Sequence, residues 1–458
     1  MDRHRVVIVG AGPAGIRCAE TLVSAGIRPI IIDEGQRCGG QIYRQQPDNF
    51  GRSKSDLYGT EADKADDVHT SFEAIKDKIE YLPETMVWNI AKEKLFTVCG
   101  TTQKMIPYDA LIICTGATDR IMPVKGWDLS GIYSLGGAQI ALKSQACSIG
   151  HEVVFMGTGA LLYLVAAQYI KAGATVKAVL DTSSYFNRIK ALPKLLVRPA
   201  ALWNGIVLSK DIIKAGVLIK TGIRPVEVEG SKELGVSAVT YKTQFGTEKT
   251  VQCDAAAMGY HLRPETQIAD LARCQFKFDK KTRQWLLQRD ADGRASQPGV
   301  YLAGDGSAIM GADAAELSGK LVAMTVLEDL GLSVDLTEKN KLSQKIAKQA
   351  RFANGLAQAF PWPARQAKNL TDDTIVCRCE VVSAGELRRT VRETGAEEVN
   401  RAKAFSRVGM GRCQGRYCGH AAAEIIAAEA EIPVEDVGRI RTQAPIKPLT
   451  IAVEDGDT

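Results

Sequence analysis

Four cysteines lie in two close pairs near the end of the chain, Cys377 with Cys379 and Cys413 with Cys418. Clustered thiolates in an otherwise ordinary globular chain favour a metal centre, because structural disulfides are rare in the reducing cytosol. Four thiolates suit either a tetrahedral zinc ion or a 2Fe–2S cluster. A C-x-C pair is unusual for zinc, and glycines beside the ligands leave backbone amides free to donate to bridging sulfides. The pattern favours 2Fe–2S, with zinc or no metal as the alternatives.

At the other end of the chain, a glycine-rich turn between an apolar run at 6–9 and a helix expected from Ile16 to Ala25 has the pattern of a dinucleotide fingerprint. The first glycine permits a tight turn, the second lets the backbone approach a pyrophosphate, and the third allows close packing of helix on strand. The helix N-terminus offers free amides and partial positive charge to the phosphates. The predicted phosphate-binding residues are Gly10, Gly12, Pro13, Ala14 and Gly15.

A second predicted strand, over 29–32, ends in two acids. A carboxylate at this place can accept the hydrogens of both adenosine ribose hydroxyls. Spacing favours Asp33 for that role, with Glu34 as the alternative. A nucleotide-borne redox group and a thiolate-ligated centre in one chain indicate that electrons pass between them.

Further segments indicate FAD rather than NAD. Asp305 follows a strand that begins at Val300 and is expected to bind a ribityl hydroxyl. The helix expected from Ala312 to Leu330 would aim its N-terminus at the flavin pyrimidine and stabilise charge on reduced flavin. The remaining predicted flavin contacts are Gly40, Gln41, Thr115, Gly116 and Gly304.

These motifs, in this order, resemble the two-dinucleotide-domain flavoproteins of the pyridine-nucleotide disulfide reductase type over roughly residues 5–330. The resemblance implies an α/β fold in which a second Rossmann unit is inserted into the FAD domain and, in the family, binds NAD(P)H. Here the second turn, Gly157 to Gly159, carries Leu162 where a third glycine is expected, and Asp181 follows the next strand one residue late. We therefore expect a scaffold without nicotinamide, leaving open another adenine nucleotide. Disulfide reduction is excluded because only Cys38 lies near the first candidate dithiol position.

The C-terminal region is predicted to be helical. A helix over 337–360 precedes two prolines that mark a linker. Ser383 and Glu386 form a capping box, and a last helix is expected from His420 to Ala430. With its cysteines, this region resembles the bacterioferritin-associated-ferredoxin type of 2Fe–2S domain, a small all-α fold. The family more often closes with C-x-x-C, so the spacing of Cys413 and Cys418 departs from it.

Length and composition agree with a multidomain globular chain of 458 residues, 45% hydrophobic and 24% charged, with a net charge of +5. Dispersed basic residues and few aromatics argue against nucleic acid as a partner. A cytoplasmic protein is expected, with membrane contact at most peripheral. The predicted domains are 1–120 and 263–335 for FAD, 121–262 for the second Rossmann unit, 336–370 for a helical linker and 371–458 for the cluster.

The segments at 33–34, 39–43 and 409–419 are similar to the A (alpha) subunit of heteromeric amine dehydrogenases, which include octopine and nopaline oxidases, D-hydroxyproline dehydrogenase and hydrogen cyanide synthase. The resemblance implies the electron-transfer component of an enzyme acting on CH–NH donors. It also implies an FAD-containing, amine-oxidising B (beta) subunit, room for a small third subunit, an FMN shared at the interface, and an external electron acceptor. A stand-alone NAD(P)H-dependent reductase and a redox-sensing binding protein are the alternatives. The amine and the acceptor leave no motif in this chain.

Overall fold

The computed structural model describes residues 4–47, 49–452 and 454–455. Its first sheet is fully parallel, in the order β20-β7-β1-β2-β3. Every residue of β1, β7 and β20 is buried, as expected for central strands covered on both faces. The strands are β1 (Val6–Val9), β2 (Ile30–Ile32), β3 (Glu80–Leu82), β7 (Ala110–Ile113) and β20 (Val300–Leu302).

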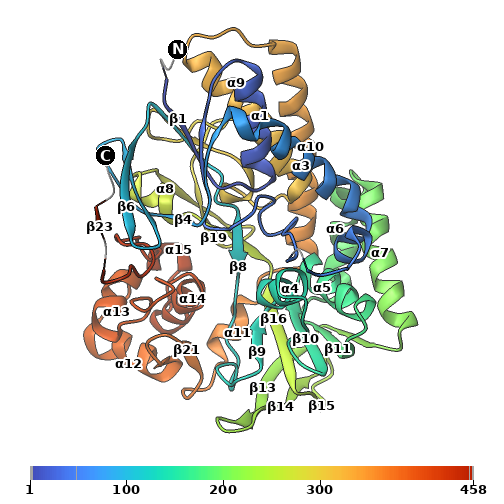
Figure 1. Cartoon of the computed structure of the whole chain (residues 1–458). Coiled ribbons are helices and arrows are strands. Elements are labelled where there is room, and N and C mark those ends of the chain that lie inside the picture. Colours follow the sequence, from blue (N-terminus) through green and yellow to red (C-terminus); the bar gives the residue numbers. More distant parts are fainter. Residues whose placement is uncertain (1–3, 48, 453, 456–458) are drawn as a thin grey trace.

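Two helices far apart in the sequence, α1 (Pro13–Ser24) and α9 (Ala312–Asp329), pack together beside this sheet (Figure 1). Their close approach requires Gly319, where a Cβ would lie 2.1 Å from the carbonyl oxygen of Ala14. Helix α1 begins three residues before the predicted start, because proline is readily accommodated in the first helical turn. Helix α9 has the predicted start and ends one residue earlier than expected.

Shorter elements complete the FAD-type unit. The antiparallel strands β4, β5 and β6 flank the first sheet, and β23 adds to β6 from the other end of the chain. The elements are α2 (Lys54–Tyr58), α3 (Ala62–Ile75), β4 (Thr85–Ala91), β5 (Lys94–Cys99), β6 (Thr102–Pro107), α8 (Gln267–Leu271), β18 (Phe276–Asp279), β19 (Gln284–Leu287) and β23 (Glu454–Asp455).

A second parallel sheet, in the order β12-β11-β10-β16-β9, forms the inserted Rossmann unit. The antiparallel pair β8 (Ala117–Asp119) and β17 (Leu262–Pro264) connects it to the FAD-type unit (Figure 1). The unit contains β9 (Ile132–Ser134), α4 (Leu135–Ser144), β10 (Glu152–Thr158), α5 (Ala160–Lys171), β11 (Thr175–Asp181), α6 (Tyr185–Leu195), α7 (Pro199–Lys214), β12 (Leu218–Thr221), β13 (Arg224–Ser231), β14 (Gly235–Lys242), β15 (Glu248–Gln252) and β16 (Ala255–Tyr260).

The C-terminal unit lies against both preceding units and is mainly helical (Figure 1). Helix α12 begins at the predicted capping box, in which Ser383 and Glu386 bond reciprocally to backbone amides. Two details correct the prediction. The unit is not purely α, because β21 and β22 form a short hairpin around the first cysteine pair, and α15 follows the helix predicted to be last. Helix α10 (Leu336–Ala359) precedes this unit and packs on α6 and α9. The elements of the C-terminal unit are α11 (Ala364–Lys368), β21 (Ile375–Cys377), β22 (Val382–Ser383), α12 (Ala384–Thr394), α13 (Val399–Ser406), α14 (Gly419–Ala430) and α15 (Val434–Val437).

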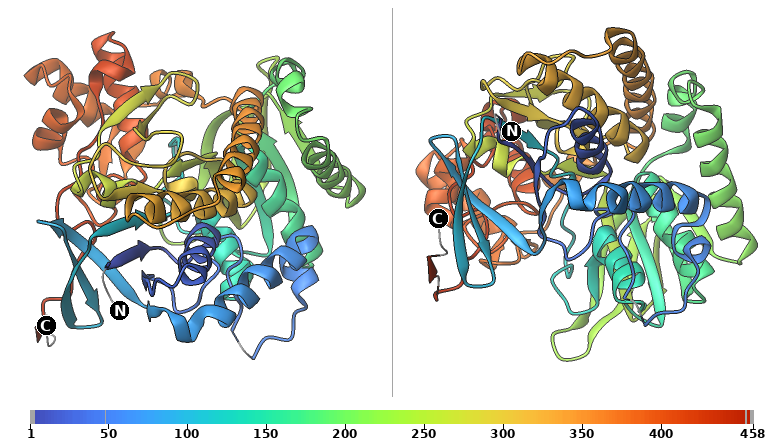
Figure 2. Two further views of the ribbon diagram at one scale, coloured as in Figure 1. Left: turned by 90° about the horizontal axis from the view of Figure 1, so that it is seen from above. Right: turned by 45° about the horizontal axis from the view of Figure 1, so that its top comes forward.

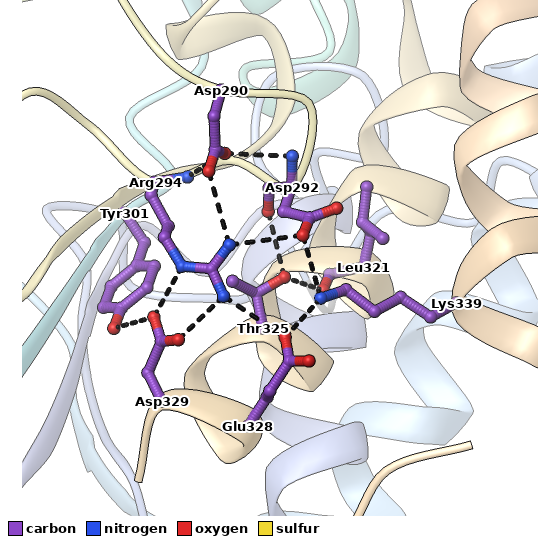
Figure 3. Close-up of polar contacts among 9 residues, drawn as sticks. All are labelled: Asp290, Asp292, Arg294, Tyr301, Leu321, Thr325, Glu328, Asp329 and Lys339. Atoms are coloured by element: carbon purple, nitrogen blue, oxygen red, sulfur yellow. Dashed lines mark hydrogen bonds and ion pairs between the residues drawn. The ribbon is translucent and has the colours of Figure 1, made fainter. Parts of the chain in front are cut away.

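A network of ion pairs fastens α10 to the FAD-type unit (Figure 3). Arg294 pairs with Asp329 at 2.7 Å, and Lys339 of α10 pairs with Asp292 at 2.9 Å. Hydrogen bonding to Arg294 lowers the pKa of Asp329.

Among the described residues, no helix is both long enough and apolar enough to cross a membrane.

Replacing Arg294 with leucine is expected to lower the free energy of unfolding by about 1–2 kcal/mol, because several carboxylates lose a shared cation. Urea unfolding measures this change, with the exposed Arg28→Leu as the matched control. Asp329 has a lowered pKa, so its contribution is present above the ordinary aspartate pKa of about 3.9 and is lost as the pH falls below it. The variant should therefore lose less stability on acidification. Equal unfolding of both variants would contradict this role.

Candidate functional site

The two ends of the chain contribute to a single cavity of about 2210 Å³. The predicted flavin residues that line it are Gly10, Gly12, Pro13, Ala14, Asp33, Glu34, Gly40, Gln41, Thr115, Gly116, Gly304 and Asp305. The four predicted metal ligands, Cys377, Cys379, Cys413 and Cys418, line it as well. Gly15 does not reach the cavity and lies buried beneath the turn. Residues more than 360 positions apart in the sequence therefore share one site.

The glycine turn has the backbone that its sequence predicts. Gly10 has a φ of +111°, and a Cβ there would lie 2.4 Å from the carbonyl oxygen of Cys114. A Cβ on Gly15 would lie 1.9 Å from the carbonyl oxygen of Gly10, so helix and strand can approach only without a side chain. Gly12 differs, because its nearest neighbour would be Gly40 Cα at 3.7 Å. The fold leaves open the position where the backbone would approach a pyrophosphate, and no side chain caps helix α1 there.

Asp33 lies where the sequence places the ribose acid. Its two carboxylate oxygens accept hydrogen bonds from the amides of Ala11 at 2.5 Å and Gly35 at 2.6 Å. Each oxygen retains a lone pair for a further hydrogen bond. Glu34 is exposed and forms an ion pair with Lys447 from the C-terminal segment. The geometry therefore favours Asp33 over Glu34 as the ribose ligand.

At the opposite end of the flavin site, Asp305 accepts hydrogen bonds from the amides of Met310 at 2.8 Å and Gly311 at 3.0 Å. Burial raises the pKa of Asp305. Helix α9 begins at once after Gly311, and no side chain caps it. Its free amides border the cavity, which fits the predicted interaction with the flavin pyrimidine.

The four cysteine thiols contact one another in a row. Cys418 lies within hydrogen-bonding reach of both Cys377 and Cys413, and Cys379 lies within reach of Cys413. These contacts, with hydrogen bonds from nearby amides, lower the pKa of Cys377 to about 6 and that of Cys413 to about 5. A Cβ on Gly411 would lie 2.2 Å from Cys379 Cβ, so only glycine fits beside this ligand.

Backbone amides surround the cysteine thiols, whereas the sequence predicts amide donors to the bridging sulfides of a cluster. The amides of residues 380 and 409 reach Cys377, and those of residues 415 and 417 reach Cys413. Among the described residues, no group of three or more His, Cys, Asp or Glu side chains is arranged to hold a single metal ion. Four thiols with amide donors nevertheless match the donor set of a 2Fe–2S cluster, in which each iron takes two thiolates.

The loop that carries Cys413 and Cys418 is bonded to the flavin site. Arg416 pairs with Glu265 at 2.9 Å, and the hydroxyl of Thr115 donates to the Glu265 carbonyl at 2.6 Å. Arg263 donates to the Arg416 carbonyl at 2.9 Å. Sequence analysis missed Glu265 and Arg263, because residues 150 positions apart give no local signal of contact. Two further ion pairs join the same units, Arg439 with Asp270 and Arg283 with Glu424.

Changing Glu265 to glutamine is expected to lower the free energy of unfolding by about 3 kcal/mol, because the buried Arg263 and Arg416 lose their carboxylate. Burial alone would raise the pKa of Glu265, but these two arginines lower it. Urea unfolding, followed by cluster absorbance, measures the loss. The conservative change Glu435→Gln, at an exposed ion pair with Lys280, serves as the control. If both variants unfold alike, the buried pair does not fasten the cluster loop.

In the second Rossmann unit, side chains of this chain already bond to the carboxylate that would contact a nucleotide ribose. Asp181 is fully buried and accepts from Thr158 and Tyr163, each at 2.8 Å. It also forms an ion pair with Arg188 at 2.6 Å. Leu162, where a third glycine was expected, is fully buried in the core of the unit.

The second turn is also covered by the segment that follows α10. A Cβ on Gly159 would lie 3.5 Å from the ring of His261, and that ring contacts the carbonyl of Phe360 at 2.6 Å. Burial lowers the pKa of His261 to about 4, so this ring is neutral at physiological pH. The ring of His261 therefore lies directly beside the turn.

NADH and NADPH are therefore expected neither to bind measurably nor to bleach the flavin of the purified chain. Isothermal titration and anaerobic absorption spectra test the two statements. The variant Asp181→Asn should unfold more easily, since it leaves Arg188 without its carboxylate, but should gain no response to NADH. Prompt bleaching of the wild-type flavin would contradict the prediction and would identify a working nicotinamide site.

Two protein-family models match this chain. Residues 4–319 match the family model "Pyridine nucleotide-disulphide oxidoreductase", and residues 375–428 match "BFD-like [2Fe-2S] binding domain". The chain is 36% identical over 98% of its length to the A subunit of opine oxidase from Rhizobium meliloti, 86% of which is covered. The chain belongs to the family of opine oxidase A subunits. Its FAD and 2Fe–2S domain types and its oxidoreductase class follow from that membership.

Two other comparisons concern a more distant relative and a solved structure. The hydrogen cyanide synthase subunit HcnB of Pseudomonas protegens is 29% identical over 97% of this chain and 96% of its own length. The crystal structure of L-proline dehydrogenase from P. horikoshii superposes with a TM-score of 0.70 at 18% identity, covering 98% of this chain and 78% of that chain. At this identity the superposition shows the fold alone. The predicted α/β two-dinucleotide fold is confirmed.

Proposed function

We propose that this member of the opine oxidase family is the electron-transfer subunit of a heteromeric secondary-amine oxidase or dehydrogenase. The observation that carries the proposal is the single cavity lined by both the flavin motifs and the four cysteines. When bound, FAD exchanges electrons in pairs and a 2Fe–2S cluster exchanges them singly. We take this shared cavity as the route for electron transfer between the two groups.

The residues of this chain have separate tasks in that function. We assign pyrophosphate binding to the turn at 10–15, the ribose contact to Asp33 and the ribityl contact to Asp305. The four cysteines hold the cluster, and Glu265 with Arg416 fixes the distance from the cluster loop to Thr115. No residue of this chain is assigned to amine oxidation. That step belongs to a partner.

The partner is an FAD-containing, amine-oxidising subunit, by analogy with the named relatives, which are themselves subunits of oxidases and synthases. An FMN at the interface between the two subunits completes the proposed route, and electrons leave to an external acceptor. An opine or a D-hydroxyproline-type amine is the substrate class. An opine would give a 2-oxo acid and an amino acid, and a hydroxyproline would give a cyclic imine.

The test uses the full chain, tagged and purified anaerobically from its native cells with the subunits it carries. Octopine, nopaline and hydroxyproline are added separately, and flavin absorbance and the cluster signal are followed. One of these amines should reduce both centres in the complex, whereas the separated chain should respond to no amine. Reduction of the separated chain by an amine would overturn the assignment of amine oxidation to a partner, and reduction by NADH would favour a stand-alone reductase.

A further inference from the structure

The consecutive helices α6 and α7, named the hairpin below, both carry exposed apolar side chains; α6 packs on α10, and α7 packs on α5. Along α6 these side chains recur at intervals of three and four residues, which places them on one helix face. Along α7, Ile212 is the one fully buried apolar side chain among the described residues. The exposed residues of this hairpin face are Tyr185, Phe186, Ile189, Leu192, Leu196, Trp203, Ile206, Val207 and Ile213. Exposed apolar side chains gathered on one face of a helix indicate an interaction site.

The net positive charge of the hairpin equals the net charge of the whole chain. Residues 185–214 contain six Lys or Arg and one Asp, an excess of five, and the chain's net charge is +5. The rest of the sequence therefore balances to zero. Two of the six bases, Arg188 and Arg198, form ion pairs with acids outside the hairpin. The other four, Lys190, Lys194, Lys210 and Lys214, are exposed.

Two of these four lysines lie beside exposed aromatic rings. Lys190 Nζ lies 4.5 Å from the ring centroid of Phe186, and Lys210 Nζ lies 5.5 Å from that of Trp203. Figure 2 shows α6 and α7 at the edge of the molecule, with their outer side open to approach. Long lysine side chains can keep their charge in water while their stems follow an apolar surface.

We propose that the hairpin face of α6 and α7 docks this chain onto an anionic lipid surface. Helices that lie in a membrane interface combine lysine on the polar side with Trp, Phe and Leu on the other. Tryptophan and tyrosine settle at headgroup depth. Protein–protein interface cores are instead depleted in lysine, so lysines interleaved with aromatic rings fit lipid better than a protein partner.

The chain offers an internal probe for this contact. Trp203 is 59% exposed, whereas Trp127 and Trp362 are buried and the remaining two tryptophans are partly buried. On binding vesicles, the emission of Trp203 should shift to shorter wavelength, and brominated lipid should quench it. The Trp203→Phe variant should still bind the vesicles but lose the fluorescence response.

The decisive experiment is flotation of the full, FAD-loaded chain with vesicles of phosphatidylcholine, with or without phosphatidylglycerol. Binding is expected with the anionic lipid and is expected to weaken as salt is added. Each lysine at an anionic surface contributes roughly fivefold to affinity, so Lys190→Gln with Lys210→Gln should lower it about 25-fold. Ile189→Ser with Ile213→Ser should also release the chain. Lys277→Gln with Lys281→Gln, and Leu234→Ser with Phe245→Ser, change exposed residues outside the hairpin and should leave binding unchanged.

Failure of the wild-type chain to float with anionic vesicles would overturn the proposal, as would equal flotation of the hairpin variants. A further contrary result would be a change in the mass of the isolated chain, or of its complex, when the hairpin face is altered. That result would identify the face as a protein contact. The flavin spectrum, followed in parallel, should be that of the wild type in every variant, which separates docking from the electron-transfer function.

Discussion

Replacing Cys413 with serine is expected to abolish the 2Fe–2S absorbance and to remove the bound iron and sulfide. Cys413 contacts two of the other three thiols, and these contacts lower its pKa to about 5, which favours the thiolate form that binds iron. A serine hydroxyl stays protonated at this pH and is a much harder ligand. Electron delivery from amine to acceptor should fall to background in the complex, because the single-electron carrier is lost.

Matched variants separate loss of the cluster from loss of the fold. Cys99→Ser and Cys147→Ser change exposed cysteines outside the C-terminal unit and should retain full cluster content. FAD content of the Cys413→Ser chain should stay near that of the wild type, since the glycine turn lies in a separate unit of the fold. Measurement of iron, sulfide and extracted FAD on the same samples tests all three statements. Retention of two irons per chain by the serine variant would remove Cys413 from the ligand set.

Replacing Gly12 with alanine is expected to weaken FAD binding by roughly a hundredfold, about 2.7 kcal/mol, while leaving the protein folded. The backbone at Gly12 has a φ of −79°, which alanine adopts without strain. In the folded chain its new Cβ would meet only Gly40 Cα, at an ordinary 3.7 Å. The methyl group would instead occupy the place where a pyrophosphate must approach the backbone.

Gly15→Ala is the informative contrast to this variant. A Cβ there lies 1.9 Å from a backbone carbonyl, so the variant should lose stability whether or not FAD is present. Fluorescence titration with FAD and urea unfolding of both apo chains separate the two effects. Unchanged FAD affinity of Gly12→Ala would show that the cofactor does not approach this turn.

Much of the fold could be read from local patterns in the sequence. The apolar run at 6–9 and the glycines after it specify a buried strand and a close turn, because the φ of Gly10 and the packing at Gly15 exclude any side chain. Ser383 and Glu386 specify the start of α12 through bonds within one helical turn. Such features depend on neighbours a few residues away, and those neighbours can be read directly along the chain.

The structure differs from the sequence-based predictions where contacts between distant or very short segments decide the conformation. The short hairpin of β21 and β22 was missed because its pairing joins very short segments, in which periodicity gives no signal. The pairing of Asp181 with Arg188 could have been suspected from their separation of seven residues, but only the fold shows that four groups converge on that carboxylate.

The sequence alone determined which chemical groups this protein carries: a dinucleotide turn, an acid after the second strand, and four thiolates in two pairs. Residue type and short spacing are sufficient for these, since each motif is local. Only the tertiary structure placed the thiolates and the flavin motifs in one cavity, joined Glu265 to Arg416, and left the face of α6 and α7 exposed. Those arrangements depend on how separate units pack, and packing brings together residues whose distance along the chain carries no information about their distance in space.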